Sequence, residues 1–290
     1  MHSPARPVPP AEIAAAFPPR PADAHKYSVG TVTVVGGSGR YIHAPVICAL
    51  GARSAGAGLV HLVVPDASRI AAGSLVPEAT FMKQTPTCVP PKADVTVVGM
   101  GLGNSQAAEM LVSRILSGSK GRFVIDADAL TVLANWYARR EHAFPHVEGQ
   151  ELVLTPHAGE AARLLAVSSE DVQRDRPAAA RAIVRRYGAV VVLKGARTLV
   201  ARPGSDDLFE CAAGNPHMAV GGMGDLLSGV LAARWAYLKD SFLAARSAVW
   251  MHAAASDSIV FADPPGDPSV ANTARAVASL RVMLERGSAA

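Results

Sequence analysis

The sequence predicts a three-layer α/β/α domain built around a mainly parallel central sheet. Short apolar runs rich in β-branched residues alternate with helical patterns along most of the chain, as expected of parallel strands covered on both faces. The chain has 290 residues, of which 50% are hydrophobic and 18% are charged. That length and composition suffice for one large globular domain with a sizeable core.

The order of the elements follows from the apolar runs. Six runs predict the parallel strands: 31–35, 59–64, 95–98, 123–125, 152–154 and 190–193. The pattern then changes, and residues 198–201 and 208–211 around a Pro-Gly turn predict a hairpin. Helical spacing predicts helices from about Ala44 and about Gln106, and over about 225–238, 241–257 and 274–285, the last capped by Asn272 or Thr273.

The first two dozen residues differ in composition from the rest of the chain. Residues 1–24 are rich in proline and alanine, and they predict an arm that packs on the body or on another subunit. Residues 25–290 contain no linker and no internal repeat. They predict a single catalytic domain.

Composition and charge exclude several classes of protein. The net charge of +4 comes from scattered basic residues, which fits anionic substrates and does not indicate nucleic acid. No apolar run is long enough to span a bilayer, and residues 1–7 lack the apolar core of a signal peptide. Cys48, Cys88 and Cys211 are far apart and form no Cys-x-x-Cys motif, so no disulfide framework or zinc site is indicated. We expect a cytoplasmic protein.

A glycine-rich loop over 214–224 leads into the helix predicted at 225. The N–H groups of Gly222, Met223 and Gly224 would lie at the helix N-terminus, where unpaired donors and the macrodipole favour an anion. A carboxylate there, Asp225, is suited to accept a proton from a hydroxyl that attacks a phosphate. The alternative interpretation is a simple turn with Asp225 as N-cap. Leucine, valine and tryptophan at helical spacing predict the buried stripe: Leu227, Val230, Leu231, Trp235 and Leu238.

Other polar motifs follow the predicted strands, at the edge where open α/β sheets bind ligands. Gly36-Gly37-Ser38-Gly39 lacks the last glycine of the dinucleotide fingerprint, and the chain contains no P-loop. His157 is either a structural hydrogen-bonding residue or a ligand contact. Glu160 is either an acid favoured by a helix N-terminus or a holder of a water-bound Mg²⁺.

Lys194 ends the apolar run at 190–193 beside Gly195, where the backbone can approach a ligand closely. Its side chain either extends from the core to solvent or reaches a phosphate, and we favour the phosphate. Asp126 and Asp128 end another buried strand, and one of them is expected to face the site.

Together these motifs resemble the NAD(P)H-hydrate dehydratases of the ribokinase-like superfamily. The resemblance covers nearly the whole chain from about Lys26, and six motifs occur in the family's order. They are Val35–Ser38 with Tyr41, Ala44-Pro45 and Gly56–Val60; Gly101–Gly103; Asp126–Leu130; Thr155–Glu160; Lys194-Gly195; and Gly222–Asp225.

The resemblance implies a ribokinase-like fold and a metabolite-repair reaction. Hydrated NADH or NADPH (NADHX, NADPHX) would be dehydrated at the expense of ADP or ATP, with Mg²⁺. Ala44, Gly103, His157 and Asp225 would contact the hydrated cofactor. The adenine nucleotide would be held by the residues around the lysine and the glycine-rich loop: Lys194, Gly195, Ala196, Arg197, Thr198 and Gly224. A homo-oligomer, with a tetramer as one option, and a separate NAD(P)HX epimerase are the implied partners.

Three residues depart from the family pattern. His43 and His217 stand where glycine is usual, and Met223 stands where a small hydroxylated residue is usual. We expect these departures to change contacts with the substrate more than they change the fold. Two other functions are compatible with the motifs: a kinase for a small alcohol such as a sugar or vitamin precursor, and a nucleotide-binding regulator that has lost catalysis.

Overall fold

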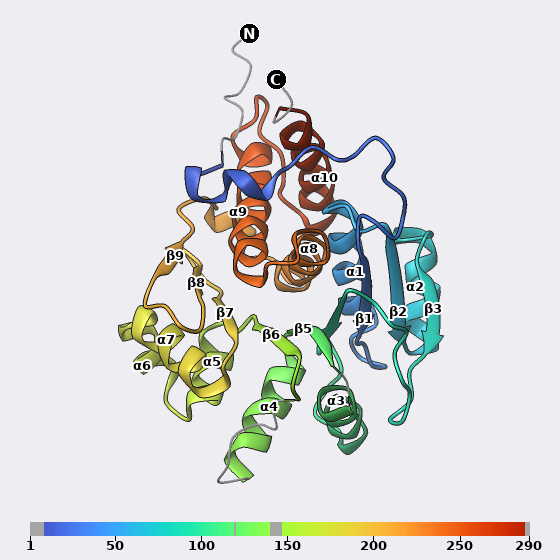
Figure 1. Ribbon diagram of the computed structural model, residues 1–290, viewed down its shortest axis with the longest axis vertical. Coiled ribbons are helices and arrows are strands. Elements are labelled where there is room, and N and C mark those ends of the chain that lie inside the picture. Colours follow the sequence, from blue (N-terminus) through green and yellow to red (C-terminus); the bar gives the residue numbers. More distant parts are fainter. Residues whose placement is uncertain (1–8, 119, 140–146, 288–290) are drawn as a thin grey trace.

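The computed structural model describes residues 9–118, 120–139 and 147–287, which form a nine-stranded sheet between two layers of helices (Figure 1). One face of the sheet is covered by α1 (Ala44–Ser54), α2 (Asp66–Leu75), α8 (Met223–Leu238), α9 (Ser241–Val260) and α10 (Val270–Gly287). The other face is covered by α3 (Gln106–Gly118), α4 (Asp128–Arg139), α5 (Ala158–Leu165), α6 (Ser169–Arg174) and α7 (Arg176–Tyr187).

The sheet has the order β3-β2-β1-β4-β5-β6-β7-β8-β9. Strands β1 to β7 run parallel to one another. At one edge β8 pairs antiparallel with β7, and β9 pairs antiparallel with β8. The strands are β1 (Thr31–Val35), β2 (Leu59–Val64), β3 (Thr80–Lys83), β4 (Val95–Val98), β5 (Gly121–Ile125), β6 (Gln150–Leu154), β7 (Val190–Leu193), β8 (Leu199–Ala201) and β9 (Leu208–Glu210). All six predicted parallel strands and the predicted hairpin are confirmed.

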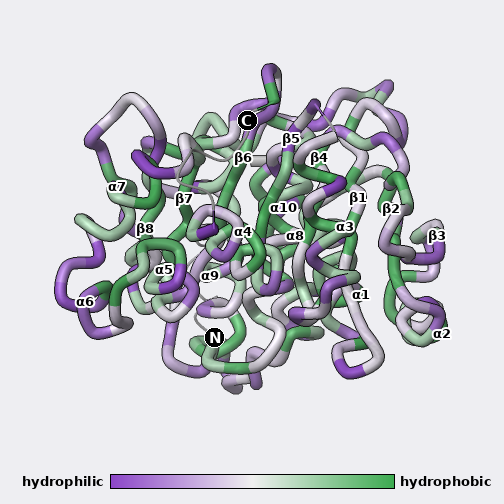
Figure 2. The backbone as a smooth tube through the Cα atoms, turned by 90° about the horizontal axis from the view of Figure 1, so that it is seen from below, coloured by the Kyte–Doolittle hydropathy of each residue, from purple (hydrophilic) through white to green (hydrophobic). Residues whose placement is uncertain are grey.

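Two apolar clusters, one on each side of the sheet, form the core. Successive strand residues point to opposite faces, so Val34 packs with α1 and α8 while Val35 packs with α3 and α4. Figure 2 shows the strands as mainly hydrophobic stretches, while hydrophilic and hydrophobic residues are mixed along the helices around them. Burial on both faces explains why the strands are continuous apolar runs instead of alternating patterns.

Helix α8 lies in the centre of one layer, between α1 and α9 (Figure 1). Every residue of it from Leu226 to Ala236 is buried, so the predicted stripe is too narrow. Glycines allow the two helix backbones to meet: a Cβ placed on Gly229 would lie 1.9 Å from the Cys48 carbonyl oxygen, and one on Gly51 would lie 2.2 Å from the Leu226 carbonyl oxygen. This close packing fixes the N-terminus of α8 relative to the sheet.

The structure differs from the sequence predictions at several elements, among them α2, α6 and β3, which were not predicted, and the start of α10. Strand β3 was not predicted, because its residues are mostly exposed and form no apolar run. Helix α10 begins at Val270, so Asn272 and Thr273 lie inside it and the predicted cap is wrong. The Ser269 hydroxyl instead accepts from the Asn272 N–H.

The N-terminal segment packs on the α8–α9 layer (Figure 1). A 3₁₀ helix, η1 (Ala11–Ala16), places Ile13 and Phe17 in the core, and the Phe17 ring contacts Trp250 edge-on with centroids 5.7 Å apart. The first eight residues of the predicted arm lie outside the described residues.

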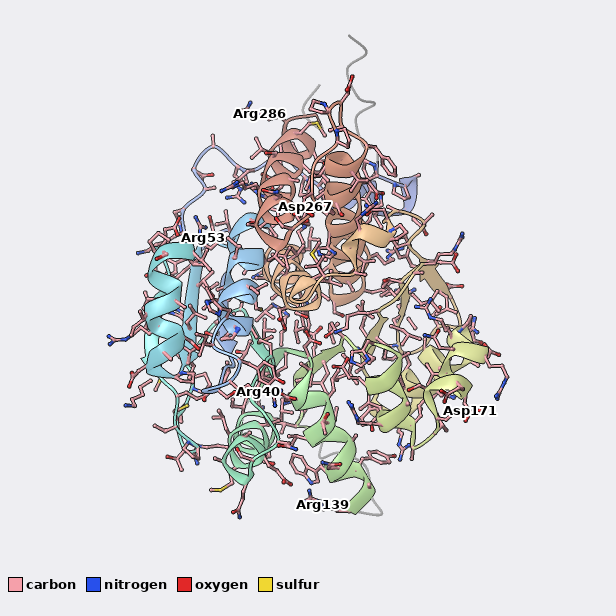
Figure 3. All side chains as sticks on the ribbon, turned by 180° about the vertical axis from the view of Figure 1, so that it is seen from behind. Arg40, Arg53, Arg139, Asp171, Asp267 and Arg286 are labelled. Atoms are coloured by element: carbon pink, nitrogen blue, oxygen red, sulfur yellow. The ribbon has the colours of Figure 1, made fainter. Side chains whose placement is uncertain are left out.

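Charged side chains gather at the periphery of the molecule. Figure 3 shows Arg139, Asp171 and Arg286 on the outer parts of their helices. Among the residues that the structure describes, no helix combines the length and apolar character that crossing a membrane requires.

Candidate functional site

The polar motifs converge at one edge of the sheet. Strands β1, β4, β5, β6 and β7 are parallel neighbours, so the residues that follow their carboxyl ends lie side by side. These residues are Gly36, Gly99, Asp126, Thr155 and Lys194. The predicted alignment of the motifs along one edge is therefore confirmed.

Asp225 lies in the first turn of α8, beside this edge. The helix begins at Met223, with Gly222 as N-cap in the left-handed region at φ +93° and with no side-chain capping bond. Asp225 is thus the third helical residue, and the N-cap alternative is wrong. Burial raises the pKa of Asp225 to about 7; the negative charge of Asp126 adds to the rise, and the positive charge of Lys194 opposes it. A carboxylate with this pKa is suited to exchange a proton near neutral pH.

The backbone donors at the start of α8 are only partly free. The Met223 N–H donates to the Val220 carbonyl oxygen at 3.3 Å, so it is not available to an anion as expected. Among the described residues, the N–H groups of Gly222, Gly224 and Asp225 have no backbone acceptor. Two of the three predicted donors, Gly222 and Gly224, therefore remain free at the positive end of the helix dipole, together with the Asp225 N–H.

Lys194 is held between two carboxylates. Its Nζ donates to Asp126 Oδ1 at 2.8 Å and lies 3.7 Å from Glu160 Oε2. Burial lowers the pKa of Lys194, but the charges of Asp126 and Glu160 outweigh this effect and the pKa lies above its usual value. A Cβ placed on Gly224 would lie 3.3 Å from Nζ. The ammonium group is therefore charged, beside the start of α8.

Asp126 and Asp128 both take part in the site, in different ways. Asp126 is 1% exposed, and besides Lys194 it accepts from the Ser228 hydroxyl at 2.6 Å. Asp128 begins α4 and accepts from the Gly103 N–H at 2.7 Å. Asp126 thus connects β7 to α8, and Asp128 fixes the loop after β4.

His157 and Glu160 form a reciprocal cap at the start of α5. His157 Nδ1 accepts from the Gly159 and Glu160 N–H groups, and Glu160 Oε2 accepts from the His157 N–H at 2.8 Å. The structural interpretation of both residues therefore holds. The His157 side chain is nevertheless 55% exposed at the sheet edge.

Both oxygens of Glu160 already have partners, since Oε1 lies 3.4 Å from His157 Nε2. The described residues contain no group of three or more His, Cys, Asp or Glu side chains placed to hold a metal ion. Glu160 does not fit as a direct metal ligand.

A cavity of about 550 Å³ opens beside Lys194 and Gly224. Its walls come from the turn after β7, the loop before α8, the first turn of α8, and α9. Of the predicted nucleotide residues, 194–198, Met223 and Gly224 line it, and Gly222 does not. Asp225 is not among the described residues that line the cavity, but it directly follows Gly224, which does.

The remaining predicted residues lie further along the same edge. A Cβ placed on Gly101 would lie 3.2 Å from Ala44 Cβ, which brings the loop after β4 onto the start of α1. Gly103 has φ +77° and open space beside it. Two residues that depart from the family pattern, His43 and His217, are both exposed.

One feature of the cavity was missed from the sequence. His252 in α9 forms part of its wall, is 5% exposed, and its Nε2 has no hydrogen-bond partner among the described residues. Burial lowers the pKa of His252 to about 4, so the ring is neutral. The sequence around His252 contains no motif that indicates a binding site, because this residue lies within a helical pattern far along the chain from the other motifs.

An acid at a helix N-terminus, near a lysine at a strand end that lines a cavity, on a mainly parallel sheet, defines a ribokinase-like protein. A solved structure with the same fold is an ADP/ATP-dependent NAD(P)H-hydrate dehydratase from Bacillus subtilis co-crystallised with ATP and Mg²⁺. It has a TM-score of 0.82 and 24% identity, with 94% of this chain and 96% of that chain covered. The predicted ribokinase-like fold is confirmed.

The chain belongs to the NAD(P)H-hydrate dehydratase family, whose model matches residues 32–268. It is 39% identical to an ADP-dependent (S)-NAD(P)H-hydrate dehydratase of Neisseria meningitidis, covering 84% of this chain and 81% of the relative. It is also 39% identical to a bifunctional NAD(P)H-hydrate repair enzyme of Gloeobacter violaceus, covering 82% of this chain and 47% of the relative. The chain spans about half the length of the bifunctional relatives that it matches.

Proposed function

We propose that the protein is an ADP-dependent (S)-NAD(P)H-hydrate dehydratase that returns NADHX and NADPHX to NADH and NADPH. The observation that carries this proposal is Asp225, a carboxylate whose pKa burial raises to about 7 and on which the charge of Lys194 acts. Lys194 and Gly224, the residue before Asp225, line the cavity. The Neisseria relative is an ADP-dependent dehydratase. ADP is therefore the proposed phosphoryl donor, with ATP as the other donor to test.

In the proposed reaction, the C6 hydroxyl of the hydrate attacks the terminal phosphorus of the nucleotide, and Asp225 accepts the hydroxyl proton. The bond from phosphorus to the bridging oxygen breaks, which releases AMP from ADP or ADP from ATP. The ring nitrogen then expels phosphate from C6 with its lone pair, and loss of a neighbouring ring proton restores the dihydropyridine. The protein's task is mostly positioning and charge neutralisation, as in other phosphoryl transfers.

The proposed roles follow the placement of the side chains. Lys194 and the free N–H groups of Gly224 and Asp225 would stabilise charge on the phosphates. Residues 194–198 would hold the adenine nucleotide in the cavity that they line. The loops and helix starts along the β4 to β6 edge would contact the hydrated cofactor: Ala44, Gly103 and His157.

Mg²⁺ is the proposed metal, and it would supply charge neutralisation on the phosphates. We assign it no direct protein ligand, because both Glu160 oxygens already have partners. Mg²⁺ bound with a nucleotide is usually coordinated mainly by phosphate oxygens and water, which agrees with this assignment.

The proposed assembly is a homo-oligomer, and the proposed partner is a separate NAD(P)HX epimerase, since the longer relatives are bifunctional repair enzymes. The proposed compartment is the cytoplasm. Cys48, Cys88 and Cys211 are buried free thiols, which suits a reducing environment.

The test follows absorbance at 340 nm with the protein, NADHX, Mg²⁺ and either ADP or ATP. We expect a nucleotide-dependent rise that Asp225→Asn lowers by about a hundredfold to ten-thousandfold, the usual effect of losing a general base. Asp171→Asn, an exposed carboxylate on α6, is the matched control and should keep full activity. Unchanged turnover in Asp225→Asn would refute the role of Asp225. A stable phosphorylated product on a small alcohol would favour the kinase alternative, and ADP binding without any turnover would favour the regulator.

A further inference from the structure

Arg176 stands behind the turn that lines the nucleotide cavity. It is the first residue of α7, which packs beside β7 and β8 (Figure 1). Its guanidinium donates to three carbonyl oxygens of one segment: from Nη2 to Leu193 at 3.0 Å, and from Nη1 to Ala196 at 2.5 Å and Arg197 at 3.4 Å. No carboxylate oxygen among the described residues lies within 4.0 Å of it. All its observed acceptors are backbone carbonyls.

The segment that it holds is a tight turn over 195–198. The Thr198 hydroxyl donates to the Gly195 carbonyl oxygen at 3.0 Å and closes the turn. Arg197 has φ +57°, in the left-handed region that residues other than glycine rarely adopt. This conformation is unfavourable for such a residue, so the surroundings must stabilise this form of the turn.

The contact with Arg176 sets the direction of the central peptide of the turn. A trans peptide is planar, with its C=O and N–H on opposite sides. The Ala196 carbonyl points at Arg176, so the Arg197 N–H points away from it. Residues 194–198 line the cavity, whereas Arg176 is not among the described residues that do so. That N–H therefore points away from Arg176, within a segment whose residues all line the cavity, and it has no acceptor among the described residues.

We propose that Arg176 is a positioning residue of the nucleotide site. It holds the 195–198 turn in the form that presents the Arg197 N–H to the phosphates of a bound nucleoside diphosphate or triphosphate, next to the Lys194 ammonium. Its positive charge behind the turn, which the nearby Glu210 carboxylate offsets only from a distance, adds to the attraction for these anions. The proposal rests on the nucleotide site of the proposed function and adds a residue and a mechanism to it.

The experiment measures dissociation constants for ADP and for adenosine by calorimetry, with wild type, Arg176→Ala and Arg176→Lys. We expect Arg176→Ala to weaken ADP binding by about tenfold or more. This is the effect of losing the hydrogen bond from the Arg197 N–H to a charged phosphate. Lysine should be intermediate, because it retains the charge and lacks the fork. Adenosine binding should change by less than about threefold. Arg174→Ala, two residues earlier on an exposed ion pair with Asp171, is the matched control.

Two further measurements separate positioning from a general loss of structure. Arg197→Gly removes the cost of the left-handed conformation, so adding it to Arg176→Ala should restore part of the ADP affinity. In wild type, the Arg197 amide proton should shift downfield in NMR spectra with ADP and not with adenosine.

The outcomes distinguish this proposal from the proposed function. If wild type binds neither ADP nor ATP, the proposed nucleotide site is refuted, and the role of Arg176 is refuted with it. If wild type binds ADP and Arg176→Ala binds it equally well, or loses ADP and adenosine to the same extent, only the positioning role is overturned. A double variant no better than Arg176→Ala would overturn the role of the turn.

Discussion

Replacing Asp225 by asparagine should change the pH dependence of folding stability in a predictable direction. Burial raises the pKa of Asp225 from an ordinary 3.8 to about 7. The folded protein therefore holds this proton more tightly than the unfolded chain does. The stabilisation from the bound proton is fully present below about pH 3.8 and is lost as pH rises through about 7.

The size of the effect follows from the two pKa values. At about 1.4 kcal/mol for each pKa unit, a change from 3.8 to about 7 corresponds to about 4 kcal/mol. Asparagine is neutral at every pH. The stability of Asp225→Asn relative to wild type should therefore increase by about 1.4 kcal/mol per pH unit between pH 5 and 7 and stay constant above about pH 7.5.

The assay is urea unfolding of both proteins at pH 5, 6, 7 and 8, followed by tryptophan fluorescence. Asp171→Asn is the control, because hydrogen bonds from Ser168 and Arg174 hold the pKa of Asp171 below its usual value. The stabilisation from the Asp171 carboxylate is lost only as pH falls into the acid range, so this variant should show a constant difference from pH 5 to 8. A constant difference for Asp225→Asn as well would refute the raised pKa. The same pKa predicts that kcat/KM rises with pH and levels off above about 7, because the general base must be ionised.

Two more predictions concern the surroundings of this carboxylate. Asp126→Asn removes a negative charge that raises the pKa of Asp225, so the midpoint of the pH–rate profile should move to lower pH. The same variant leaves the Lys194 ammonium without its closest carboxylate, so the free energy of unfolding measured with denaturant should fall by about 3 to 5 kcal/mol. Gly229→Ala places a Cβ 1.9 Å from the Cys48 carbonyl oxygen and should cost at least about 1 to 3 kcal/mol. Gly73→Ala, in α2 with nothing within 4 Å, should instead stabilise the protein by about 0.5 to 1 kcal/mol; equal effects of the two alanines would contradict the packing argument.

The strands could be predicted because burial on both faces leaves a simple pattern. Residues 190–193 are apolar throughout, and 31–35 consists of valine and threonine; both strands contribute to the apolar clusters on the two faces of the sheet. Strand β3 left no such pattern, because it pairs only with β2 and exposes Phe81 at the edge. The start of α10 was also missed. The helix begins earlier than predicted, and the Ser269 hydroxyl accepts the capping hydrogen bond that was expected of Asn272 or Thr273.

Within the site, the sequence located the groups but not their partners. Asp225 and Lys194 were identified because each follows a glycine-rich loop or a buried strand. That Lys194 pairs with Asp126, and that Asp126 reaches Ser228 on α8, depends on which strands are neighbours in the sheet. Arg176 gave no signal at all, because its acceptors are backbone carbonyls and carry no side-chain identity.

Burial and the charges around Asp225 together explain why a carboxylate can serve there. Burial is the largest cause of its raised pKa; Asp126, Glu160 and Asp128 add to the rise, and Lys194 alone among the named charges lowers the pKa. Without these surroundings a carboxylate would be too weak a base to accept a proton from an alcohol near neutral pH. The same excess of negative charge repels the phosphates that the proposed function requires. Lys194 and the free N–H groups of α8 offset part of that repulsion, and the proposed Mg²⁺ on the nucleotide would offset more. An arrangement that makes Asp225 basic therefore needs cationic help to admit its second substrate, which links the pKa of the base to the affinity for the nucleotide.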